Sequence, residues 1–197
     1  MRSKVIQIGF NRTGTSSLAR FFNINGFSVA GHAKCANKIL ANINNNRLPL
    51  DDLNFDLAQD LEDHKNNIYI QDYYQEIDSA HPNTKFILTT RSCEKWIESR
   101  LNHNAGRYVR RALRNHKITD VEELCDIWRE DFYKYHLEVI RYFKGNPNFY
   151  IHSLEAINTE KLIKFLSDDY AFTIQDYPKI QRRKKGPPNY DLAINDD

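Results

Sequence analysis

The fold is decided by residues 5–18, which read Val5-Ile6-Gln7-Ile8-Gly9-Phe10-Asn11-Arg12-Thr13-Gly14-Thr15-Ser16-Ser17-Leu18. The apolar residues before Gly9 are typical of a parallel strand that is covered on both faces. Gly14 and the small hydroxyl residues after it are typical of a turn and the start of a helix, where the first backbone N–H groups have no partner inside the helix. The stretch therefore predicts a strand, a turn and a helix that together bind a phosphate-like anion.

The spacing from Gly9 to Ser16 matches that of a P-loop, G-x-x-x-x-G-K-[ST], at every position except one. Thr15 stands where the P-loop has its lysine. An enzyme that uses a nucleoside triphosphate needs this lysine against the β- and γ-phosphates, whereas the nearest cation here is Arg12, inside the loop. The difference disfavours a nucleotide or small-molecule kinase with a degenerate P-loop. That kinase remains one alternative, and a nucleotide-binding protein without turnover is another.

The same loop resembles the segment that binds the 5′-phosphosulfate in the sulfotransferases, which commonly carries a basic residue followed by x-G-T-[TS]. The resemblance implies that the ligand is 3′-phosphoadenosine 5′-phosphosulfate (PAPS), with 3′-phosphoadenosine 5′-phosphate (PAP) as its product. It also implies that the 5′-phosphosulfate is held by the following residues: Arg12, Thr13, Gly14, Thr15, Ser16 and Ser17. No metal is required for this chemistry in principle.

A second segment resembles the 3′-phosphate motif of the sulfotransferases. Residues 85–91 predict a strand that ends in Arg91, and the helix predicted after it carries Ser99, eight positions further on. The resemblance implies that these two residues hold the 3′-phosphate of the nucleotide. Their chemistry agrees with that role, because a guanidinium offers five N–H donors in a fixed fork and serine offers a hydroxyl.

A third segment, Gln181–Pro188, is a basic run that ends in glycine and resembles the Arg-Lys-Gly loop that closes over the nucleotide in many sulfotransferases. The matching positions are Lys184, Lys185 and Gly186, with Lys184 in place of the arginine. The other interpretation is a solvated tail, because charge runs near chain ends are often that. Together with a closing strand and helix at 148–167, the resemblance spans nearly the whole chain.

Sulfuryl transfer to a hydroxyl or amine also needs a group that removes the proton of the acceptor. Sulfotransferases place this base after the second major strand, which is predicted here at 67–71, so Asp72 is the first candidate. The alternative role of Asp72 is to cap the following helix. His32, which follows the predicted strand at 27–30, is the second candidate. Surface or packing roles are predicted for the remaining histidines, with His103 left open: His64, His81, His103, His116, His136 and His152.

Alternating strands and helices predict one α/β domain of P-loop-like, three-layer architecture, with a central parallel sheet flanked by helices. Strands are predicted near 4–10, 27–30, 67–71, 85–90 and 148–152. Helices are predicted near 15–25, 34–44, 73–80, 93–103, 106–115, 119–144 and 158–167, with a further acidic helical stretch at 50–65. The domain is predicted to span residues 1–197, with 173–197 as an extended C-terminal segment.

Composition limits the remaining possibilities. The 197 residues suffice for one domain with a core. The 28 basic residues are nearly balanced by 26 acidic ones, and no nucleic-acid reader motif is present, so a nucleic-acid partner is not expected. Three scattered cysteines indicate neither a disulfide framework nor a zinc site. With no apolar segment long enough for a signal peptide or membrane anchor, a cytoplasmic protein is expected. The acceptor, whether a small molecule, a glycan or a peptide, and the oligomeric state do not follow from the sequence.

Overall fold

The computed structural model describes residues 2–178 and Tyr190. The chain divides into two compact units. The first consists of Met1–Thr90 and Asn146–Ile180, and the second of Arg91–Gly145 and Gln181–Asp197. All strands of the described residues belong to the first unit, whereas the second is helical.

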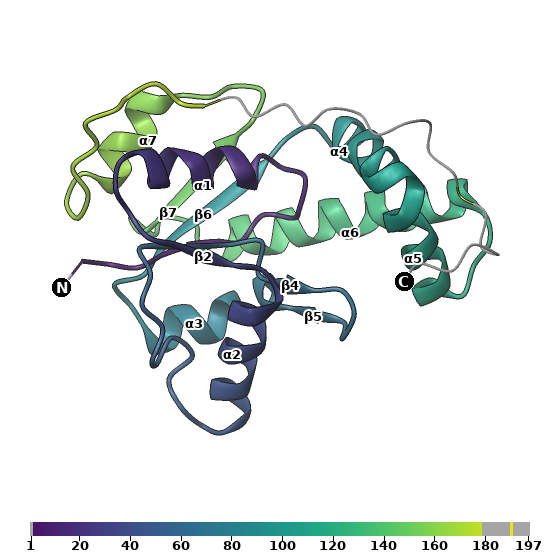
Figure 1. Ribbon diagram of the computed structural model, residues 1–197, viewed down its shortest axis with the longest axis horizontal. Helices are drawn as coiled ribbons and strands as arrows, with labels where there is room; N and C mark the ends of the chain where they lie inside the picture. The colour runs from purple at the N-terminus through teal and green to yellow at the C-terminus, as the bar shows by residue number, and fades with distance from the viewer. Residues whose placement is uncertain (1, 179–189, 191–197) are drawn as a thin grey trace. The chain divides into compact units, whose positions relative to one another are not determined.

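A parallel sheet forms the centre of the first unit (Figure 1). In the described part of the chain it has five strands in the order β2-β3-β1-β6-β7. Their bounds are β1 Val5–Gln7, β2 Val29–Gly31, β3 Leu57–Gln59, β6 Lys85–Thr90 and β7 Phe149–Ser153. Each neighbouring pair is parallel, with Val5 opposite both Leu57 and Lys85. The predicted α/β fold with a central parallel sheet is therefore confirmed.

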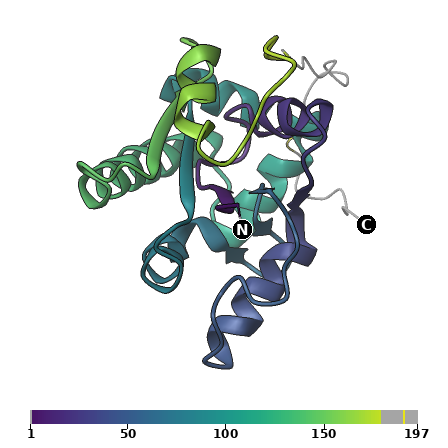
Figure 2. The same ribbon diagram turned by 90° about the vertical axis from the view of Figure 1, so that its left-hand side faces the viewer.

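Helices cover both faces of this sheet. In both views α1 (Thr15–Ile24) and α7 (Thr159–Leu166) lie above it, and α2 (His32–Asn44) and α3 (Tyr74–Ala80) lie below it (Figures 1 and 2). The core beneath α1 and α7 is made of fully buried apolar side chains, among them Val5, Leu18, Phe21, Phe22, Leu57, Ile87, Leu162 and Leu166. Burying a side chain of this size stabilises the fold by about 1.5–3 kcal/mol. This packing holds the first turn of α1 against the sheet.

The segment after α7 completes this core. Phe172 stacks on Phe21 with ring centroids 4.8 Å apart, and Tyr177 lies 5.3 Å from Phe21 and 5.0 Å from the ring of His152. The described residues of the predicted extended segment, 173–178 and Tyr190, form no helix or strand.

Two predicted elements are wrong. The stretch 50–65 is not helical: it contains β3, a central strand of the sheet, and β4 (Glu62–Asp63). The segment predicted as a sheet strand at 67–71 is β5 (Ile68–Tyr69), which pairs antiparallel with β4 in a separate two-stranded sheet. The physical reason is a tight connection: Asn67 has a left-handed φ of 60°, and the chain turns back on β4 instead of entering the main sheet.

The second unit consists of α4 (Cys93–Leu101), the 3₁₀ turn η2 (His103–Gly106), α5 (Arg107–His116) and α6 (Val121–Tyr142). The aromatic rings of Trp96 and Trp128 form its centre, and both are almost fully buried. The guanidinium of Arg100 lies over Trp96, 3.9 Å from the ring centroid, and 5.1 Å from that of Trp128. The predicted helices at 93–103, 106–115 and 119–144 are thus confirmed, with ends that differ by a few residues.

Candidate active site

The loop between β1 and α1 is fixed to the sheet by a chain of hydrogen bonds. The amide of Gln7 donates to the hydroxyl of Thr89 (2.8 Å), which lies 2.7 Å from the hydroxyl of Thr13. Thr13 in turn donates to the carbonyl of Phe10 at 2.5 Å. Gly9 is required here, because a Cβ at this position would lie 2.0 Å from the carbonyl oxygen of Thr89. The loop therefore sits directly on β6.

The loop ends where α1 begins. Gly14 is the N-cap, with a left-handed φ of 97°, and its carbonyl accepts hydrogen bonds from the backbone of Ser17 (3.0 Å) and Leu18 (3.1 Å). Thr15 and Ser16 form the first turn, where the backbone N–H groups of a helix point outward. Arg12 also has a left-handed φ, 67°, which is uncommon for a residue with a side chain. The predicted strand, turn and helix start are confirmed, and their geometry suits an anion.

His32 lies at the carboxyl end of β2. It is the first residue of α2, its side chain is exposed, and its backbone N–H donates to the carbonyl of Asp60 at 3.0 Å. Asp60 follows β3, so the ends of two neighbouring parallel strands meet here. Ligands bind at such ends in open parallel sheets. The predicted location of His32 is confirmed, whereas its role as base stays a prediction.

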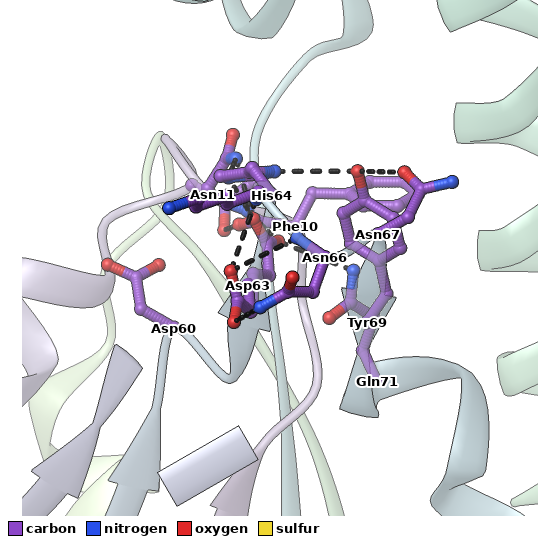
Figure 3. A network of polar contacts seen from close by, with 12 residues as sticks. Phe10, Asn11, Asp60, Asp63, His64, Asn66, Asn67, Tyr69 and Gln71 are labelled. Carbon is purple, nitrogen blue, oxygen red and sulfur yellow. Dashed lines mark hydrogen bonds and ion pairs between the residues drawn. The ribbon is translucent and has the colours of Figure 1, made fainter. Parts of the chain in front are cut away.

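A buried carboxylate, Glu62 of β4, joins this edge to the loop. Its two oxygens accept hydrogen bonds from the backbone of Asn11 (3.3 Å) and from the Asn11 side chain (2.8 Å). Gln71 donates to the same carboxylate at 3.3 Å, and Nε2 of His64 lies 2.9 Å from it. Figure 3 shows Asn11 beside His64, with Gln71 at the base of the network. Sequence reasoning missed Glu62 and His64 as site residues.

The hydrogen-bond partners of His64 indicate which of its nitrogens carries a proton. An ionised carboxylate only accepts hydrogen bonds, so Nε2 is assigned as the N–H that donates to Glu62. Nδ1, on the other side of the ring, lies 3.5 Å from the hydroxyl of Tyr69, which donates to the side chain of Asn67 at 3.3 Å. The side chain of His64 is 24% exposed, against 6% for Glu62. A carboxylate that orients an imidazole in this way is the arrangement of a general base.

Asp63 holds the β4–β5 connection that carries His64. Its carboxylate accepts hydrogen bonds from the side chains of Asn37 (2.8 Å) and Asn66 (2.7 Å) and from the backbone of Lys65 (3.1 Å). These hydrogen bonds, led by that of Asn37, lower the pKa of Asp63 below its usual value. Since Asn37 belongs to α2, the turn is tied to the main fold.

The prediction for Asp72 assumed that this residue follows a strand of the main sheet, and it does not. It lies in the short 3₁₀ helix η1 (Ile70–Tyr73) that follows β5, and its side chain is exposed. Because β5 is outside the parallel sheet, the argument that Asp72 follows a major strand is wrong, although a role in catalysis is untested. The strand of the parallel sheet that precedes Asp72 in the chain is β3, which lies beside β1, and the polar residues that follow it include Asp60 and Glu62.

The second predicted phosphate site lies in the second unit. Arg91 lies two residues before the start of α4, and Ser99 lies two turns into this helix; both side chains are partly exposed. The third site, Lys184, Lys185 and Gly186, lies outside the described residues. Among residues 2–178 and 190, there is no group of three or more His, Cys, Asp or Glu side chains that could hold a metal ion. Nor does this part of the chain contain a helix with the length and hydropathy needed to cross a membrane.

Comparisons with known proteins address the family. No curated protein matches this chain. A family model described as "Sulfotransferase domain" matches residues 4–160, which include the loop, the β4–β5 ribbon and the α4 segment. A match over this much of the chain shows that the protein belongs to the sulfotransferase domain family.

Proposed function

We propose that this protein transfers a sulfuryl group from PAPS to the hydroxyl or amine of an acceptor. The observation that carries the proposal is the loop before α1, in which Gly14 opens the helix, Arg12 is the cation and Thr15 replaces the lysine of a nucleoside-triphosphate enzyme. Membership of the sulfotransferase domain family supports this interpretation over a kinase.

The residues of the loop fit an anionic sulfate donor. Gly9 and Gly14 let the backbone turn tightly against the sheet, and the N-terminus of α1 offers N–H groups and the positive end of its dipole. PAPS supplies an activated sulfuryl group joined to a phosphate that leaves. We assign the 5′-phosphosulfate to Arg12 and to the backbone from Thr13 to Ser17. Arg12 would stabilise the negative charge that develops on the leaving phosphate.

We further assign the 3′-phosphate to Arg91 and Ser99, and a closing role to Lys184, Lys185 and Gly186. An arginine suits a phosphate because two of its N–H groups can bind two oxygens at once. These assignments rest on the resemblance of the motifs to those of the family. The acceptor, a small molecule, a glycan or a peptide, is not specified by these residues.

For the base, we favour His64, with Glu62 as the residue that positions it. His64 lies 3.3 Å from Asn11, a residue of the loop itself, so its ring is next to the region where the acceptor must approach. His32 remains a candidate, because it lies at the same edge of the sheet. Asp72 remains a candidate for the base only as an untested prediction.

All three cysteines are buried and free, which agrees with a reducing compartment such as the cytoplasm, where we propose that the enzyme acts.

The test has two steps. The first is calorimetry with PAP and with adenosine 5′-phosphate, without added metal. PAP is expected to bind at least tenfold more tightly, because a charged hydrogen bond to the 3′-phosphate contributes about 1.5–3 kcal/mol. The second step is transfer of labelled sulfate from PAPS across a panel of hydroxyl and amine acceptors. Equal affinities for the two nucleotides, together with binding of ATP and magnesium, would favour the kinase.

Two matched variants test the role that we assign to Arg12 in the loop. Arg12→Ala is expected to cut the transfer rate severely but to leave part of the PAP affinity, because the N-terminus of α1 remains. Arg20→Ala, on the exposed side of α1, is the control and should change neither quantity. PAP binding without transfer to any acceptor would leave the chain as a nucleotide-binding protein, and normal turnover of Arg12→Ala would remove the role assigned to Arg12.

A further inference from the structure

Helix α6 of the second unit exposes a row of apolar side chains. Tyr133 is 62% exposed, Leu137 49% and Ile140 42%. These residues are spaced i, i+4 and i+7, so they lie along one face of the helix. Leu137 is about 160° around the helix from the buried residues Tyr135 and Val139, so it points away from the core. Apolar side chains that are exposed in a row indicate an interaction surface.

Charged residues extend this row at both ends. Glu130 lies on the same face one turn before Tyr133, whereas Lys144 lies in the turn that follows α6, two residues after the helix ends at Tyr142. Both are exposed, and the structure gives neither an ion pair within the described residues. We call the five residues Glu130, Tyr133, Leu137, Ile140 and Lys144 the α6 stripe. It has an acidic beginning, an apolar middle and a basic end.

The order of charges along the α6 stripe makes it complementary to itself. Glu130 lies seven residues before Leu137, and Lys144 lies seven residues after it. If two copies of α6 pack antiparallel about a two-fold axis at Leu137, Glu130 of each copy meets Lys144 of the other. The same alignment places Tyr133 against Arg141 of the second copy, an arginine–aromatic contact. A parallel alignment would instead place like charges together.

We propose that the α6 stripe is the interface of a symmetric dimer formed with a second copy of this chain. Burial of the apolar middle drives association, and the two Glu130–Lys144 pairs set its direction, because exposed ion pairs contribute more to orientation than to affinity. Each copy presents the same patch, as a two-fold interface requires. One pair of helices is a small interface, so we expect reversible association in the micromolar range. This proposal does not depend on the sulfotransferase activity.

Sedimentation equilibrium of the full chain, over a range up to about 200 µM, tests the proposal. The unaltered protein is expected to show a monomer–dimer equilibrium. Leu137→Asp should be monomeric throughout, because it places a carboxylate in the centre of the interface. The matched control is Asp131→Lys, a change on the same helix about 100° away from Glu130, which should dimerise normally. Circular dichroism and the melting temperature report whether each variant folds.

Charge reversal distinguishes this dimer from any other association. Glu130→Lys and Lys144→Glu, each alone, place like charges opposite one another twice, and each should weaken the dimer about tenfold or more. An equimolar mixture of the two variants restores both pairs and should associate like the unaltered protein. The proposal is overturned if the chain stays monomeric, if Leu137→Asp still dimerises, or if the mixture is no tighter than the separate variants.

Discussion

Two histidines of the first unit, His64 and His152, have opposite surroundings. Nε2 of His64 lies 2.9 Å from the carboxylate of Glu62, and the side chain is partly exposed. His152 on β7 is 1% exposed, and neither ring nitrogen has a hydrogen-bond partner within the described residues. Burial lowers the pKa of His152 to about 4. The comparison teaches that the surroundings, and not the residue type, decide the role of an imidazole: the ring of His64 is held by a carboxylate, whereas burial keeps the ring of His152 neutral.

The largest expected effect is on catalysis. His64→Gln should lower the rate of labelled-sulfate transfer about 10²–10⁴-fold, because the acceptor then keeps its proton, while PAP affinity stays nearly unchanged. His152→Leu, the matched change at the other histidine, should leave the rate intact. If His64→Gln is fully active, Asp72→Asn and His32→Gln test the other candidates for the base. A severe loss in one of them with normal PAP binding would move the assignment to that residue.

The next effect is on stability in acid. His152 has a folded-state pKa of about 4, below the ordinary value of 6.5, so only the unfolded chain takes up this proton between those pH values. The contribution of neutral His152 to the free energy of unfolding is therefore fully present above pH 6.5. About 3 kcal/mol of it is lost as the pH falls towards 4.

Urea denaturation at pH 7, 6, 5 and 4 measures this loss. His152→Leu should remove that part of the pH dependence, because leucine has no proton to bind. Burial also lowers the pKa of His136, so part of the acid dependence will remain, and the difference between the two proteins isolates His152. Identical pH dependence in the two proteins would contradict the assignment.

A smaller effect is expected at Glu62, the carboxylate that contacts His64. Glu62→Gln keeps the shape but loses the charge and one acceptor oxygen, so part of the network around Asn11 and Gln71 is left unsatisfied. Unfolding free energy at pH 7 should fall by about 1–3 kcal/mol. The transfer rate should also fall, because the ring of His64 loses the charged group that orients it. A stability change with an unaltered rate would limit Glu62 to a structural role.

The smallest effect is expected at Tyr177, whose ring lies beside that of His152. The hydroxyl of Tyr177 is buried and has no hydrogen-bond partner in the described residues. Burial raises the pKa of Tyr177 well above its ordinary value. Tyr177→Phe should therefore leave the unfolding free energy at pH 7 within about 1 kcal/mol, or raise it slightly. A clear loss of stability would show that the hydroxyl has a partner.

The local part of the site could be predicted from the sequence, because strand, turn and helix start are adjacent in residues 5–18. The network of Glu62 could not, because Asn11 lies 51 residues from Glu62 and only the fold brings them together. No periodicity in the sequence records such a pairing. An acidic residue three positions after a buried strand was the one available signal.

The same limit explains the missed strand β3. It has three residues, Leu57–Gln59, and is flanked by Asp56 and Asp60, a pattern that looks like an acidic helix. In the fold, the Asp56 carboxylate accepts hydrogen bonds from the backbone and side chain of Ser28 beside β2, so its charge marks the beginning of a strand. The segment 67–71 has stronger β-propensity but forms only a ribbon, because propensity does not specify which strand becomes central.

The contact between Gly9 and Thr89 has a consequence for ligand affinity. Thr89 belongs to the sheet, and the loop is tied to it through Thr13 and Gln7 by hydrogen bonds of the protein itself. The conformational entropy of the loop is therefore lost when the protein folds and not when an anion arrives. A preorganised loop of this kind binds without an ordering cost of its own, so substitutions that loosen Thr89, which itself carries no charge, should also weaken anion binding.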